Sequence, residues 1–90
     1  MEPTVRLNNE DSRDYTILDV RAPDRLGLLY TIAKTLTEEG LNISLAKIST
    51  EAYRAVDVFY VSDERGQKIR DPQRLEQIRS RLLEALNGEK

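Results

Sequence analysis

Two short stretches of this 90-residue chain carry residue types that suit the binding of a small ligand. The first lies where a predicted strand turns into a predicted helix and consists of Asp24, Arg25, Leu26, Gly27 and Leu28. Free backbone N–H groups at the start of a helix favour a carboxylate or a phosphate, and Gly27 lets a ligand approach the backbone. The alternative needs no ligand, because Asp24 can cap the helix and Gly27 can let it pack on the sheet.

The second stretch follows Gly40, which is a natural stop for the same helix, and contains Asn42 and Ile43. The amide of Asn42 both donates and accepts hydrogen bonds, so it suits the head group of an amino acid. An asparagine in a turn is the alternative interpretation.

Composition excludes several classes of chemistry. The chain has no cysteine and no histidine, so disulfides, thiolate chemistry and the commonest general base and metal ligand are absent. Its net charge of −2 gives no pull toward nucleic acid or an anionic membrane. No apolar run approaches the roughly 18–20 residues of a membrane span, and no secretory leader is visible. We therefore expect a cytoplasmic protein that is not an enzyme by itself and holds no metal or cofactor.

RNA binding is disfavoured as well. Tyr15 and Tyr60 are expected to share one sheet face, as a stacking platform requires. However, residues 54–59 do not match the signature of an RNA-recognition strand, and Asp57 would repel phosphate.

The elements that position these stretches follow from apolar periodicity and from helix-capping residues. Alternating patterns predict strands over residues 5–7, 15–22, 41–50 and 55–62, and helical spacing predicts helices from Asp24 to Gly40 and from Asp71 to Gly88. Asp71-Pro72 is a strong helix start. The alternation slips near Ser44–Ala46, which predicts a bulge, and the turn at residues 51–54 contains no glycine.

This order of elements predicts one α+β domain over residues 1–90, with its core between about 5 and 86. Strand–helix–strand–strand–helix is typical of a ferredoxin-like sandwich, with two helices on one face of an antiparallel four-stranded sheet. That fold normally has a strand after its second helix. We expect the N-terminal strand, Val5–Leu7, to take the empty edge beside residues 15–22.

The motifs Asp24–Leu29, Gly40–Ile43, Ala46–Thr50 and Asp57–Asp63 together resemble an ACT domain. More narrowly, the chain is similar from about Val5 to Leu86 to the C-terminal ACT domains of bacterial enzymes that uridylylate and deuridylylate the nitrogen-regulatory P-II protein. The family usually has proline at the position of Leu26.

The resemblance implies a regulatory domain that binds an amino acid, with glutamine favoured, and controls a linked catalytic domain. It places the ligand between residues 24–28 and Asn42-Ile43, often where two ACT domains meet. The roles it suggests are Asp24 for the ammonium group, the N–H groups of Gly27 and Leu28 for the carboxylate, and Asn42 for the polar remainder.

An apolar sheet face is expected to pair with a second copy or with another ACT domain, through Ile17, Leu45, Val58 and Tyr60. Two other functions stay open at this point. One is a docking module that binds no ligand, and the other is a small acyl-phosphate hydrolase with Arg25 on the anion.

Overall fold

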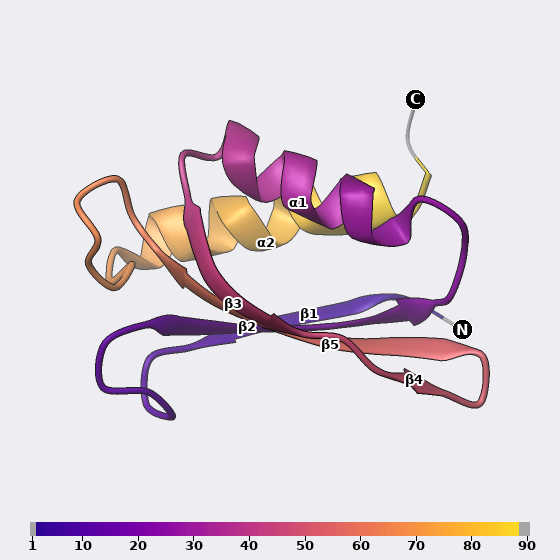
Figure 1. The fold of residues 1–90 in the computed structure, drawn as a ribbon. Helices are drawn as coiled ribbons and strands as arrows, with labels where there is room; N and C mark the ends of the chain where they lie inside the picture. The colour runs from indigo at the N-terminus through magenta and orange to yellow at the C-terminus, as the bar shows by residue number, and fades with distance from the viewer. Residues whose placement is uncertain (1, 89–90) are drawn as a thin grey trace.

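The computed structural model of the chain describes residues 2–88 (Figure 1). Its elements in chain order are β1 (Thr4–Asn8), β2 (Thr16–Pro23), α1 (Leu28–Glu38), β3 (Asn42–Lys47), β4 (Thr50–Glu51), β5 (Arg54–Ser62) and α2 (Pro72–Leu86). The sheet order is β1-β2-β5-β3, β4 also pairs with β5, and every described pairing is antiparallel. Both helices cover the same face of the sheet (Figure 1). The predicted α+β sandwich is confirmed.

The N-terminal strand occupies the predicted edge. β1 pairs with β2 along its whole length, with Val5 opposite Val20, and Val5 is buried. The edge that a strand after α2 would fill in the ferredoxin-like arrangement is therefore taken by the start of the chain. Neither helix of residues 2–88 has the length and apolarity to cross a membrane.

The strand predicted over residues 41–50 is divided, so the sheet has five strands and not four. The predicted bulge is confirmed as a register shift between Ile43 and Leu45. The ladder with β5 is then interrupted at Ser49, whose carbonyl still accepts the N–H of Val56 at 2.9 Å. The N–H of Ser49 instead donates to the side chain of Asp57, with 3.3 Å between nitrogen and oxygen. A side chain thus replaces one backbone acceptor and separates β3 from β4.

The turn without glycine between β4 and β5 is a two-residue hairpin. Glu51 pairs with Arg54, and the two residues between them, Ala52 and Tyr53, have φ of 50° and 68°. Two positive φ values define the type I′ turn, which fits the twist of a hairpin but usually selects asparagine or glycine. The sequence has neither asparagine nor glycine at these two positions, so the geometry of the turn was not predictable.

The predicted start of α2 and the predicted end of α1 are both confirmed. Asp71 caps α2 by accepting the N–H of Gln73 at 3.0 Å, and Pro72 is the first helical residue. At the end of α1 the N–H of Leu41 donates to Leu36 O, and that of Gly40 donates to Thr37 O. Gly40 has φ of +80°, so the two bonds form a Schellman motif. Leu41 therefore belongs to the helix end and not to a strand.

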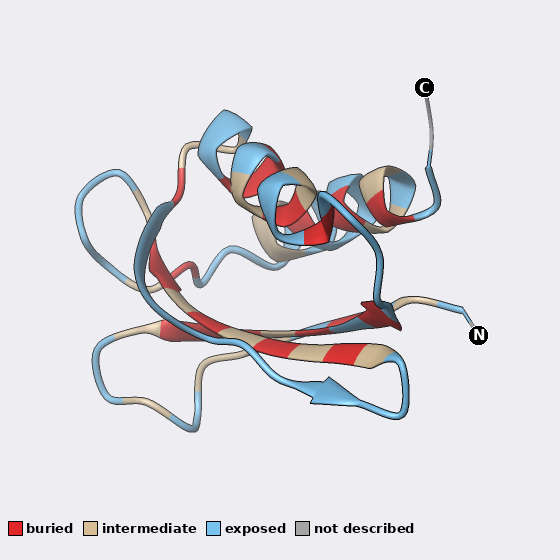
Figure 2. Cartoon of the chain, turned by 45° about the vertical axis from the view of Figure 1, so that its right-hand side comes forward, coloured by how far each residue is buried: buried red, intermediate tan, exposed pale blue. Residues whose placement is uncertain are grey.

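The core lies between the helices and the inward face of β2 and β5 (Figure 2). Along β5, buried residues alternate with half-buried ones, and Phe59 and Val61 face the helices. On α1, the apolar residue Leu29 is 46% exposed, whereas Thr35 is buried and donates its hydroxyl to Thr31 O. By contrast, all six residues of β3 are exposed, so this edge strand has little cover on either face.

Candidate functional site

The loop between β2 and α1 is built around a tight turn. The carbonyl of Arg25 accepts the N–H of Leu28 at 3.2 Å, and Gly27 has φ of 82° and ψ of 2°. These are the features of a type II turn with Leu26 and Gly27 at its centre, and its third position requires positive φ. Gly27 is therefore the N-cap of α1, and the prediction that Asp24 caps this helix is wrong.

Asp24 has a different structural role. Its backbone N–H donates to the carbonyl of Tyr53 at 3.0 Å, which ties the loop to the turn between β4 and β5. Asp24 thus lies three residues before the N-cap, and no side chain caps the start of α1 among the described residues.

The turn also decides which backbone N–H groups are free for a ligand. The N–H of Leu28 is taken by Arg25, so it is not available to a ligand carboxylate as the resemblance implied. The first helical bond runs from the N–H of Thr31 to Gly27 O, at 3.0 Å. Within residues 2–88, the N–H groups of Leu29 and Tyr30 have no hydrogen-bond acceptor. Of the two donors that the resemblance implied, the N–H of Leu28 is thus taken, whereas that of Gly27 has no acceptor among the described residues and stays available to an anion together with those of Leu29 and Tyr30.

A cavity of about 240 Å³ lies beside this loop. Residues 24–30 form one wall, and the other wall consists of Ile48, Ser49, Thr50, Ala55 and Asp57. The five loop residues singled out in the sequence, from Asp24 to Leu28, therefore do meet at one cavity. Leu26 contributes little to its interior, because its side chain is 99% exposed.

Asp57 is the cavity residue that sequence reasoning missed. It is only 2% exposed, and it faces the helices from the middle of β5. Burial raises the pKa of its carboxyl group, the N–H of Ser49 lowers it, and the negative charge of Asp24 raises it. A signal was present, because Asp57 occupies an inward position between the apolar residues Ala55 and Phe59 of an alternating strand.

Asn42 and Ile43 lie at the opposite end of the sheet. β2 and β3 both run antiparallel to β5, so they are parallel to each other, and the start of β3 is far from the end of β2. Asn42 pairs with Ser62, whereas Pro23 pairs with Arg54 at the other end of β5. Within one chain the structure therefore does not bring Asn42 to the cavity.

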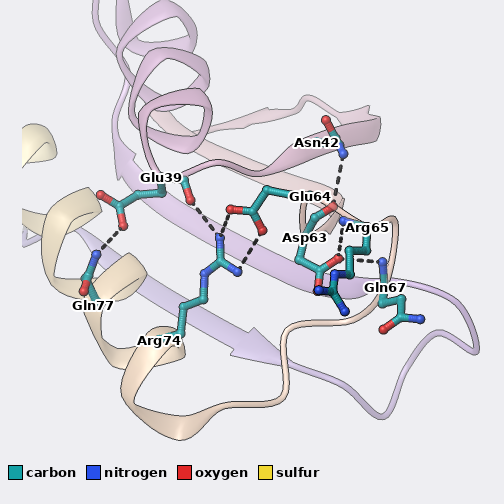
Figure 3. Close-up of polar contacts among 8 residues, drawn as sticks. All are labelled: Glu39, Asn42, Asp63, Glu64, Arg65, Gln67, Arg74 and Gln77. Atoms are coloured by element: carbon teal, nitrogen blue, oxygen red, sulfur yellow. Dashed lines mark hydrogen bonds and ion pairs between the residues drawn. The ribbon is translucent and has the colours of Figure 1, made fainter.

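The surroundings of Asn42 form a self-contained polar network (Figure 3). Asn42 donates to the carbonyl of Asp63 at 3.1 Å. Arg74 forms two hydrogen bonds with Glu64, at 2.9 and 3.1 Å, and a third with the carbonyl of Glu39 at 3.0 Å. The N–H of Gln67 is the main cause of a lowered pKa at Asp63. These contacts fasten α2 to the ends of α1 and β5, which is a structural role.

The predicted docking face is only partly accessible. Ile17 is buried at 7% exposure, so it offers little to a partner, because β1 and β5 flank it on both sides. Val58 and Tyr60 are half-buried and Leu45 is 49% exposed. The ring of Tyr60 also carries Lys47, whose Nζ lies 5.3 Å from the ring centroid. Docking through this face stays a prediction.

A second hollow lies between the two helices and holds about 420 Å³. Its charged lining residues have both signs and lie at the surface, namely Arg25, Lys34, Glu38, Arg81 and Glu84. No charged residue of that lining is buried, so the smaller cavity beside Asp57 is the better candidate for a specific site. Among the described residues, no cluster of three metal-ligating side chains is present.

Comparisons with known proteins agree with this architecture. Residues 4–88 match the family described as ACR9-like, ACT-like domain. The chain is 48% identical over 84 residues to the bifunctional uridylyltransferase/uridylyl-removing enzyme of Azospirillum brasilense, covering 93% of this chain and 9% of that enzyme. It is 41% identical over 90 residues to the enzyme of that name from Bradyrhizobium diazoefficiens, covering 100% of this chain and 10% of the relative.

A third relative, from Gluconobacter oxydans, bears the same name and is 45% identical over 86 residues, with 96% of this chain and 9% of the relative covered. The chain thus spans about a tenth of the length of these relatives. The match over residues 4–88, together with a sandwich of two helices on one antiparallel sheet, shows that the chain belongs to the ACT domain family.

Proposed function

We propose that this ACT domain binds an amino acid, with glutamine favoured, and thereby controls a uridylyltransferase/uridylyl-removing activity linked to it or borne by a partner. The observation that carries the proposal is the cavity of about 240 Å³ beside the type II turn. There the unused N–H groups of Leu29 and Tyr30 can donate hydrogen bonds to a ligand carboxylate. The names of the relatives support the choice of regulated activity.

The proposed functional unit is a pair of copies joined along β3. β3 is an edge strand with every residue exposed, and Lys47 is its sole charged residue. Exposed edges with few charges are suited to pairing with a second strand, whereas isolated domains usually protect them. The exposed apolar side chains of Ile43, Leu45 and Ile48 add surface that a second copy would cover.

Pairing along β3 also explains the separation of the two predicted ligand stretches. If two β3 strands pair antiparallel about a two-fold axis, the start of one lies beside the end of the other. Asn42 and Ile43 of the second copy then approach Lys47 and Ile48, next to the cavity. The two stretches predicted to share a ligand would thus meet between chains and not within one.

Thermal unfolding with a panel of amino acids tests the proposal, because a ligand that binds only the folded state raises its stability by mass action. Glutamine is expected to raise the melting temperature, and Asn42→Ala and Gly27→Val are expected to weaken its binding in calorimetry. Arg13→Ala is the matched control, since Arg13 lies outside the cavity and the β3 edge. A melting temperature that no amino acid moves would refute ligand sensing.

The alternative is a docking module that needs no ligand, and the exposed β3 strand favours it as the second candidate. Light scattering separates the two functions. A dimer that forms without ligand, combined with no response to the amino-acid panel, would support the docking module alone. A monomer at high concentration would refute self-pairing.

A further inference from the structure

Asp57 is a buried carboxylate without a cationic partner. Its side chain accepts one hydrogen bond, from the N–H of Ser49 at 3.3 Å, and it is 2% exposed. Within residues 2–88, no lysine or arginine lies within 4.0 Å of it. Removing a charge from water without a partner is costly, so such groups are rare unless something else binds them.

The position of Asp57 on the wall of the cavity shows where a partner can come from. The cavity beside the β2–α1 loop also contains Asp24, whose charge acts on Asp57. Asp24 and the free N–H groups of Leu29 and Tyr30 belong to the loop wall, and Asp57 belongs to the opposite wall. The cavity therefore offers acceptors for a cation and donors for an anion.

The chemistry of the acceptors favours an ammonium group over a metal ion. Calcium takes six to eight oxygen ligands, and the described residues contain no cluster of three candidate ligands. An ammonium group has three N–H donors and needs few acceptors. One carboxylate oxygen of Asp57, assisted by Asp24, meets that need.

Building on the proposed function, we propose that Asp57 is the specificity-determining residue that binds the ligand's ammonium group. The site thereby selects molecules that carry a protonated amine next to a carboxylate, and it rejects the corresponding deaminated acids. Asp24, to which the family resemblance assigned this role, is exposed and acts as a second, weaker acceptor.

The test compares Asp57→Asn with Asp19→Asn in the full chain. Asp19 is a matched control because it is half-buried on the opposite face of the sheet and pairs with Arg21 at 3.2 Å. The probes are L-glutamine and glutaramate, which is the same molecule without its α-amino group. Calorimetry measures affinity, and thermal unfolding measures the stability of each protein with and without probe.

We expect wild type and Asp19→Asn to bind glutamine equally and to bind glutaramate poorly. Asp57→Asn should lose about ten- to hundredfold in glutamine affinity, as expected for a hydrogen bond to a charged group. Without ligand, Asp57→Asn should melt at the same temperature as wild type or higher, because an unpaired buried charge has been removed. A residue with a purely structural role would instead lower the melting temperature.

Three outcomes would contradict the inference. Asp57→Asn binding glutamine within about twofold of wild type would remove Asp57 from the site while leaving the sensor intact. Equal binding of glutaramate by wild type would show that the amine is not recognised. If wild type responds to no amino acid at all, the proposed function itself fails, and the assignment of Asp57 fails with it.

Discussion

The type II turn before α1 allows a quantitative prediction for Leu26, the position at which the family usually has proline. Leu26 occupies the second position of the type II turn at which proline is favoured, because this position requires a φ near −60°. The leucine side chain is 99% exposed, so its removal loses no packing. Within residues 2–88 the N–H of Leu26 has no acceptor, so the proline ring breaks no hydrogen bond.

Leu26→Pro should therefore stabilise the domain by restricting the unfolded chain. A compatible proline contributes about 0.4–1 kcal/mol. For a domain of this size, 1 kcal/mol shifts the melting temperature by about 4–8 °C, so a rise of about 2–8 °C is expected. The turn is already formed in the native state, so glutamine affinity should be unchanged or slightly higher.

Gly27→Ala is the matched variant of the same turn and should have the opposite effect. The added Cβ would have no atom within 4 Å, so any loss of stability comes from the positive φ alone. That strain is worth about 1–2 kcal/mol for a residue with a side chain. Circular dichroism melts of wild type and both variants measure the two effects. A melting temperature lowered by Leu26→Pro, or unaffected by Gly27→Ala, would show that the turn is of another type.

Two further predictions concern the opposite end of the sheet. Gly40→Ala should cost more than the strain at φ of +80° alone, because its Cβ would lie 2.5 Å from Glu64 Oε2 and would displace Glu64 from Arg74. The additional cost should be small, because exposed ion pairs contribute little to stability. It should vanish in a Glu64→Ala background, and chemical denaturation of the four proteins in this cycle measures it. Asp63→Asn should lower the unfolding free energy at neutral pH. Because the N–H of Gln67 lowers the pKa of Asp63, its contribution is present above the ordinary value of 3.8 and is lost as the pH falls through the folded-state pKa. Below that pH, the variant and wild type should be equally stable, and a constant difference at all pH values would contradict the argument.

The features that the sequence predicted well are those set by local chemistry. Asp71 accepts a hydrogen bond from a free N–H group at the start of a helix, and Pro72 has no N–H that would need an acceptor. Gly40 adopts the backbone conformation that ends a helix. Neither feature depends on residues that are distant in the sequence. The strand order was also predictable, because the order of strands and helices along the chain leaves few arrangements in which the helices cover one face of the sheet.

The failed predictions depend on contacts between distant segments. Asp24 has the side chain of a good cap, but a hydrogen bond to Tyr53 and a type II turn move the helix start to Leu28. Ile17 has the phase of an outward residue, yet its neighbours in adjacent strands bury it. Tertiary contacts decided both the role of Asp24 and the burial of Ile17, and no local sequence pattern reveals such contacts.

The candidate site also depends on a contact between distant segments, and this contact indicates how ligand binding can be coupled to pairing along β3. Asp57 accepts the N–H of Ser49 at the point where the edge strand breaks into β3 and β4. A ligand amine that draws the Asp57 carboxylate into the cavity competes with Ser49 for it. Release of that N–H would change the end of the strand proposed to pair with a second copy. One buried carboxylate therefore connects the proposed ligand to the proposed interface, which a regulatory domain requires.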